Sequence, residues 1–146
     1  MHSERHFHGC GLCVYEEFDF FWNLAGVKLC HNGESGIVEV KCPYKARNHL
    51  ISEACDEFSD FCLQKGEGGM VSLDRSHDHY IQIQGQLLVT GCEFCELIVF
   101  TQKDIYVERV VPDLPFMEKL LCTLAAFFKE QGGKYIKERE SGHMEL

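Results

Sequence analysis

The stretch GIVEVKCPY, residues 36–44, decides how this chain is interpreted. Apolar and polar residues alternate over residues 36–41, which predicts a β-strand, and a proline ends the pattern. Successive side chains of a strand point to opposite faces. We therefore expect Glu39 and Lys41 to share one face and Val38 and Val40 to point the other way, into a core. A carboxylate and an ammonium group side by side can hold a hard cation and a water molecule.

Composition restricts the class of protein. The 146 residues suggest one domain with a sizeable core. The net charge of −9 argues against a general nucleic-acid binder. It does not exclude a nuclease, because metal ions bring positive charge to the site itself. No apolar signal segment and no membrane-spanning run is present, so the nine cysteines are expected to be reduced thiols of an intracellular protein in the cytoplasm or nucleus.

The remaining sequence predicts alternating strands and helices. Strands are expected at residues 11–15, 18–22, 25–30, 36–41, 96–101 and 105–111, and a small hairpin from 61–64 and 70–73. Helices are expected at 48–54, 78–90 and 116–131, the second capped by Gly91. We expect a flexible N-terminus over residues 1–9, one α/β domain over 10–131 with a mixed sheet flanked by helices, and a polar tail over 132–146.

Four sequence blocks in order resemble one family. They are EVKCPY at 39–44, HYIQIQGQL at 79–87, CELIVFT at 95–101 and VERV at 107–110. Together they resemble the YqaJ-type viral recombinases, which are related to lambda exonuclease and belong to the PD-(D/E)XK nucleases. The resemblance covers about residues 10–130. It implies a restriction-endonuclease-like core and metal-dependent hydrolysis of DNA ends in recombination or repair.

The resemblance also implies roles for individual residues. Glu39 and the backbone carbonyl of Val40 would hold Mg²⁺ or Mn²⁺, and Lys41 would position or activate water. Gln82 would reach the site from the helix, with Gln86 one turn further on the same face. An ordinary salt bridge and a polar helix face are the plain alternatives for these residues.

Basic residues near the site are candidates for contacts with DNA. Lys45, Arg47 and His79 are the expected substrate-binding residues, and Lys65 and His77 could extend the same rim. A scattered solvated surface would carry the same residues. The resemblance suggests a ring-forming homo-oligomer for processive members and further helices before the first block, so the chain is expected to be N-terminally truncated.

One position departs from the family pattern. The family's first metal ligand is the Asp of a block like S-P-D-G-V, and here the stretch is NLAGV, with Ala25 in its place. Alanine cannot coordinate a metal, so we hypothesise reduced or absent catalysis. Glu34 or Asp19 could supply a displaced carboxylate.

Two other classes of function remain open on sequence. The first is a non-catalytic DNA- or protein-binding module of the same fold. The second is a zinc or redox module that uses two C-x-x-C pairs, Cys10 with Cys13 and Cys92 with Cys95. About eighty residues separate the pairs, and packing explains the second, so zinc is not favoured.

Overall fold

The fold is given by a computed structural model, which describes the backbone of residues 5–9, 12–15, 18–24, 27–31 and 33–132. Side chains are described for Cys30 and for residues 33–130. The chain divides into two compact units, residues 1–112 and 113–146. The predicted helix 116–131 falls in the second unit, and each unit is described by itself.

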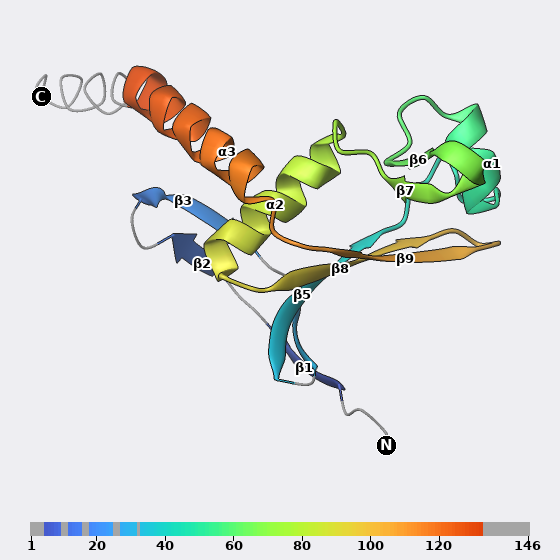
Figure 1. The fold of residues 1–146 in the computed structure, drawn as a ribbon, viewed down its shortest axis with the longest axis horizontal. Helices are drawn as coiled ribbons and strands as arrows, with labels where there is room; N and C mark the ends of the chain where they lie inside the picture. The colour runs from blue at the N-terminus through green and yellow to red at the C-terminus, as the bar shows by residue number, and fades with distance from the viewer. Residues whose placement is uncertain (1–4, 10–11, 16–17, 25–26, 32, 133–146) are drawn as a thin grey trace, which may run out of the picture. The chain divides into compact units, whose positions relative to one another are not determined.

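A mixed five-stranded sheet forms the centre of the first unit (Figure 1). Its strands, in spatial order, are β1 (Arg5–Gly9), β4 (Val27–His31), β5 (Glu34–Lys41), β8 (Phe94–Phe100) and β9 (Ile105–Val110). β5 and β8 run parallel, and the other neighbouring pairs are antiparallel. The predicted α/β class with a mixed sheet is therefore confirmed.

Two smaller antiparallel pairs accompany the sheet. β2 (Leu12–Tyr15) pairs with β3 (Phe18–Leu24), and β6 (Leu63–Lys65) pairs with β7 (Val71–Leu73). The second pair is the hairpin predicted around the glycine-rich turn. β1 lies in a segment where the sequence predicted no strand, because its histidines and charges lack the alternation typical of one.

The described part of the first unit contains two α-helices and one short 3-10 helix, η1 (Glu67–Gly69). The helix α2 (Asp78–Thr90) has the predicted bounds, and Gly91 caps it in the left-handed region at φ 63°. The helix α1 (Ile51–Glu57) begins three residues later than predicted. The Asp104 carboxylate, on the β8–β9 turn, accepts a hydrogen bond from the Ile51 N–H at 3.1 Å. A local contact also marks the start of α1, because the Glu53 side chain accepts a hydrogen bond from the Leu50 N–H at 2.9 Å.

The second unit contains α3 (Leu114–Phe127), followed by a π-helical turn, η2 (Phe128–Gly132). The Asp113 side chain accepts a hydrogen bond from the Phe116 N–H at 3.2 Å and caps the helix. The helix therefore begins two residues before the predicted start. In the part of the chain that the structure describes, no helix is long and apolar enough to cross a membrane.

The core of the first unit lies between one face of the sheet and α2. Ile37, Leu97 and Val99 are at most 1% exposed, as is Ile83 of the helix. Figure 1 shows α2 lying across β5 and β8, with the α1, β6 and β7 group beyond its N-terminal end. The buried face therefore carries the residues at odd positions of β5.

The structure corrects one prediction about the face of the sheet that points away from α2. Val40 does not point into a core, because it is 54% exposed. The strand register places Val40, Ile98 and Val107 in one row of this face, and Phe100 and Ile105 in the next. The alternation correctly predicted which residues share a face. It could not show whether another layer covers that face.

Candidate active site

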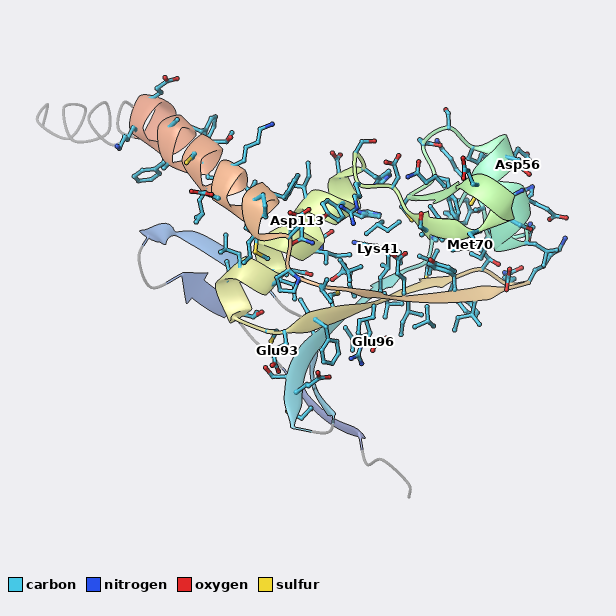
Figure 2. The ribbon with its side chains drawn as sticks, viewed as in Figure 1. Lys41, Asp56, Met70, Glu93, Glu96 and Asp113 are labelled. Atoms are coloured by element: carbon cyan, nitrogen blue, oxygen red, sulfur yellow. The ribbon has the colours of Figure 1, made fainter. Side chains whose placement is uncertain are left out.

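The candidate site starts at the C-terminal end of β5. Glu39 and Lys41 lie on the buried face of the sheet, beside Leu97 and Val99 of the parallel neighbour β8. The Lys41 ammonium is 2.7 Å from Glu39 Oε1, and the two side chains are only 18% and 14% exposed. Figure 2 shows Lys41 between the sheet and α2. The predicted pair therefore lies in a shielded position and not on an open strand surface.

Two glutamines of α2 complete the cluster. Gln82 accepts a hydrogen bond from Lys41 Nζ at 2.8 Å and donates one from Nε2 to Glu39 Oε1 at 3.1 Å. Gln86, which is 2% exposed, donates from Nε2 to Glu39 Oε2 at 3.0 Å. The expected convergence of acid, amine and helix amides is thus observed. A spacing of four residues puts both glutamines on one face of the helix.

The third glutamine of the helix has a different partner. Gln84 Nε2 donates a hydrogen bond to the Val111 carbonyl at 3.0 Å, away from Glu39. This agrees with the prediction that Gln84 faces elsewhere. Gln84 and Gln86 are thus buried amides of one helix, and only Gln86 touches the candidate site.

Lys41, one member of the cluster, lines a pocket of about 250 Å³. Its wall is formed by residues from β5, from the loop after α1 and from the start of α2, and it includes Lys41, Pro43, Asp60, Phe61, His77 and His79. Burial, and after it the positive charge of Lys41, lowers the pKa of the His79 imidazole. His77 caps α2 by accepting the His79 N–H at Nδ1, 3.1 Å away. The imidazoles of His77 and His79 therefore line the pocket beside the Lys41 ammonium group.

Cysteine also lines this pocket. Cys42 is exposed at its wall, and Cys62 is buried there. Burial raises the pKa of the Cys62 thiol to about 11, so it stays protonated at neutral pH. Cys62 is therefore a packing residue and not a nucleophile.

The structure separates the predicted basic rim. Lys45 pairs with Asp60 at the pocket, whereas Lys65 pairs with Asp56 further along the chain. The Arg47 guanidinium lies over the Tyr44 ring at 3.9 Å from its centroid. His79 lines the same pocket as Lys41, as described above. Lys65 is thus outside the group of basic residues that surround the site.

Sequence reasoning missed the contribution of the loop after α1. Asp60 and Phe61 reach both Lys45 and the pocket although they lie about twenty residues from Lys41. A lone aspartate in a polar turn carries no local signal of such a role. Only the chain path, which returns from α1 to the end of β5, brings it there.

The residues around Glu39 offer oxygen ligands to a divalent cation. Gln86 Oε1 is buried without a hydrogen-bond partner among the described residues. A buried acceptor without a donor is costly, so this amide oxygen suits a cation or an ordered water. Within the described residues no group of three or more His, Cys, Asp and Glu side chains could hold a metal. Among the described residues, the oxygen atoms around Glu39 are therefore its own carboxylate and neutral amide oxygens, a set that would suit Mg²⁺ or Mn²⁺ with several waters retained.

Of the two proposed substitute carboxylates, the structure describes only that of Glu34, and it does not lie at Glu39. Glu34 lies at the other end of β5, on the opposite face, and its carboxylate is 3.2 Å from Arg109 Nη1. Ala25 lies outside the described residues, and so does the side chain of Asp19. The possibility that Glu34 replaces the missing ligand is therefore excluded.

The two cysteine pairs can be described only in part. Cys92 and Cys95 are 3% and 0% exposed and form part of the core of the first unit. Cys10 and the side chain of Cys13 lie outside the described residues. Burial raises the pKa of the Cys95 thiol to about 12, consistent with a packing role.

Comparison with known proteins gives support at the level of the fold. No protein-family model and no curated protein sequence matches the chain. The structure is similar to that of an alkaline exonuclease, LHK-Exo, from Laribacter hongkongensis, with a TM-score of 0.65 and 15% sequence identity. The same exonuclease in complex with dAMP gives a TM-score of 0.66 and 16% identity. Each match covers 94% of this chain and 64% of the exonuclease chain. The chain thus has an exonuclease-like fold and spans about two thirds of the length of the protein it resembles.

Proposed function

We propose that this chain binds DNA ends with a divalent cation and hydrolyses phosphodiester bonds slowly, as an impaired exonuclease-like protein of DNA recombination or repair. The observation that carries the proposal is the contact of Glu39 with Lys41, Gln82 and Gln86, beside a pocket that Lys41 lines. An ordinary surface salt bridge would need neither amide and would lie in solvent. The exonuclease-like fold supports the same assignment.

The cation would be held by the Glu39 carboxylate and the Val40 carbonyl, with the Gln86 amide oxygen as a neutral neighbour. When bound, it would stabilise the negative charge that develops on the phosphate. Mg²⁺ commonly binds through one or two carboxylates and keeps several waters. A single carboxylate, with Ala25 at the position of the second, favours weak binding and slow hydrolysis.

Lys41 would orient the attacking water or the phosphate. Its ammonium group has three N–H donors, and the contacts with Glu39 and Gln82 take two of them. The third is available for a water or a phosphate oxygen in the pocket. Because Gln82 touches both Lys41 and Glu39, it would act as a positioning residue that fixes their separation.

A DNA end is the proposed substrate, with Lys45, Arg47 and His79 as candidate contacts. The LHK-Exo structure with dAMP shows a nucleotide on a similar fold, and His79 shares a pocket with Lys41 here. The overall charge of −9 makes local cations decisive for any contact with phosphate. We also propose an intracellular location and, as the sequence resemblance implies for processive members, a homo-oligomer.

The test is degradation of end-labelled linear duplex DNA with Mg²⁺ or Mn²⁺. The wild type should release labelled nucleotides slowly, and Glu39→Gln should release none. Lys41→Met should reduce the rate about 10²-fold or more while the protein stays folded. A Glu39→Gln protein as active as the wild type would overturn the proposal.

A substitution at Ala25 provides a second test of the proposed function. Ala25→Asp should increase the rate above that of the wild type, because it returns an anionic oxygen to the cation. The added carboxylate should act only together with Glu39, so Ala25→Asp combined with Glu39→Gln should be inactive. An Ala25→Asp protein that is folded but no faster than the wild type would contradict this role for position 25.

The alternative function is a non-catalytic DNA- or protein-binding module. The observation that favours it is that, within the described residues, no group of three or more His, Cys, Asp and Glu side chains could hold a metal. It predicts that wild type and Ala25→Asp bind DNA equally and that neither releases nucleotides. The nuclease assay above therefore separates the two proposals.

A further inference from the structure

A second hollow adjoins the candidate active site. Its volume is about 210 Å³, and it shares Pro43, Asp60 and Phe61 with the pocket that contains Lys41. Tyr44 and Phe58 complete its apolar wall. Because the two hollows share three residues, a ligand that extends from Lys41 would next meet aromatic side chains.

Tyr44 is the prominent feature of this second hollow. It is 75% exposed, although the Arg47 guanidinium stacks on its ring at 3.9 Å. Arg47 is itself fixed, because its Nη1 donates to the Tyr44 carbonyl at 2.8 Å and its own carbonyl accepts from the Gln102 N–H at 2.8 Å. One face of the ring is thus backed by a cation and held in place. An exposed, preorganised aromatic ring is a surface on which another flat group can stack.

The chemistry of the hollow matches a nucleobase. Its walls are mainly apolar and aromatic, and the Lys45–Asp60 ion pair supplies a donor and an acceptor at one side. Its volume is below the roughly 300 Å³ of pockets that enclose a drug-sized ligand, so it suits one ring system. A nucleobase has two apolar faces and polar edges, which such a hollow can satisfy.

We propose that an unpaired nucleobase stacks on Tyr44 and enters this hollow, while the adjoining backbone phosphate lies toward Lys41 and His79. The proposal rests on the proposed function in one respect, that the strand end held here is the one presented to Glu39. It narrows the substrate to an end whose terminal base is unpaired. A base in a duplex stacks on its neighbours and is tied to its partner, so it cannot lie on Tyr44.

The test measures binding without hydrolysis. A short single-stranded oligonucleotide with 2-aminopurine at one end is titrated with protein in EDTA, and the label is then moved to the other end. A blunt hairpin duplex of the same composition is the reference. The wild type should bind the single strand more tightly than the hairpin and should quench 2-aminopurine at one of the two ends.

Three variants test whether the Tyr44 ring is the surface on which the base stacks. Tyr44→Ala should weaken single-strand binding about tenfold, and Tyr44→Phe should bind like the wild type, because stacking needs the ring and not the hydroxyl. Phe100→Ala removes another exposed aromatic ring, on the opposite face of the sheet, and should change nothing. Equal affinity of Tyr44→Ala and wild type, or equal affinity for hairpin and single strand, would overturn the proposal.

The binding experiment can succeed or fail independently of the proposed nuclease activity. The wild type should bind the oligonucleotide in EDTA through Tyr44, whether or not it hydrolyses DNA when Mg²⁺ or Mn²⁺ is present. Tyr44-dependent binding without hydrolysis would leave this proposal standing while the proposed function fails. Absence of oligonucleotide binding by the folded wild type would overturn it and favour an apolar side chain of a protein partner as the occupant.

Discussion

Each oxygen of the Glu39 carboxylate has its own hydrogen-bond donors. Oε1 lies within hydrogen-bond distance of Lys41 and Gln82, and Oε2 of Gln86. Three donors from two elements hold the carboxylate in one orientation, which an ion ligand needs. This arrangement leaves Gln86 Oε1 buried without a hydrogen-bond donor among the described residues. A buried amide with a purely structural role would normally have such a donor.

A comparison of two buried glutamines tests whether Gln86 serves the cation. Gln86→Leu should lose about 1–3 kcal/mol of stability, because Glu39 Oε2 loses its donor. It should also lower the affinity for Mn²⁺ about tenfold, because an oriented partner of Glu39 is lost. Gln84→Leu is the matched control. It should lose about 1–3 kcal/mol of stability, since the Val111 carbonyl loses its donor, and should keep the Mn²⁺ affinity.

Calorimetry with Mn²⁺ and urea unfolding measure the two quantities separately. A folded Gln86→Leu protein with wild-type Mn²⁺ affinity would limit Gln86 to packing. Loss of Mn²⁺ affinity in Gln84→Leu would show that the helix as a whole, and not the Gln86 amide, controls the site.

His79 gives a prediction on pH. Burial and the Lys41 charge lower the pKa of its imidazole in the folded protein, so the unfolded chain takes up a proton at a higher pH. Stability should therefore be complete above about pH 6.5 and should fall as the pH drops from there through the folded pKa. Urea unfolding of wild type and His79→Asn between pH 8 and about pH 5 measures this contribution. Parallel loss of stability in both proteins would contradict it.

At the scale of elements, sequence patterns correctly predicted those helices and strands whose bounds are set by neighbouring residues. The bounds of α2 follow from its start at Asp78 and from the Gly91 cap. The β5 strand and the β8–β9 hairpin follow from alternation and from the turn between them. The start of α1 is fixed in part by Glu53 and in part by the carboxylate of Asp104, fifty-three residues away from Ile51, which no local pattern indicates. β1 depends likewise on pairing with β4, and not on a pattern of its own.

Gly36 should be indispensable to the packing of β5 against β8. A Cβ atom at this position would overlap the ring of Phe94, which is 2% exposed and covered by Arg109 at 3.8 Å. Gly36→Ala should therefore lose about 1–3 kcal/mol of stability by overpacking. Ser35→Ala, one residue earlier, adds no atom and should cost less than about 0.5 kcal/mol. Urea unfolding of both variants would refute the packing argument if Gly36→Ala matched Ser35→Ala.

At the scale of the molecule, the pocket could not be predicted because residues far apart in the sequence form its wall. The four residues that touch one another around Glu39 were predicted from two sequence blocks. The pocket beside them also takes Asp60 and Phe61 from a turn after α1, which no pattern connects to β5. The exposed row on the other face of the sheet was missed for the same reason. Alternation shows that two faces exist, and the tertiary fold decides which is covered.

The uncovered sheet face should behave as an apolar surface. Val40, Phe100, Ile105 and Val107 are each 49–59% exposed on that face. An apolar patch of this kind binds hydrophobic dyes. Val107→Lys should reduce the fluorescence of added ANS and change stability by less than about 0.5 kcal/mol. Met70→Lys, at an exposed residue next to β7, should leave the fluorescence as it is. Equal fluorescence of wild type and Val107→Lys would mean that another layer covers the face.

The most direct measurement is calorimetric titration of the folded protein with Mn²⁺, comparing wild type with Glu39→Gln. The substitution keeps the size of the side chain and removes the anionic oxygen that the cation requires. One Mn²⁺ site in the wild type that disappears in Glu39→Gln is the predicted result. Identical binding by the two proteins, or none by the wild type, would contradict the assignment of Glu39 as the carboxylate of a metal-dependent site.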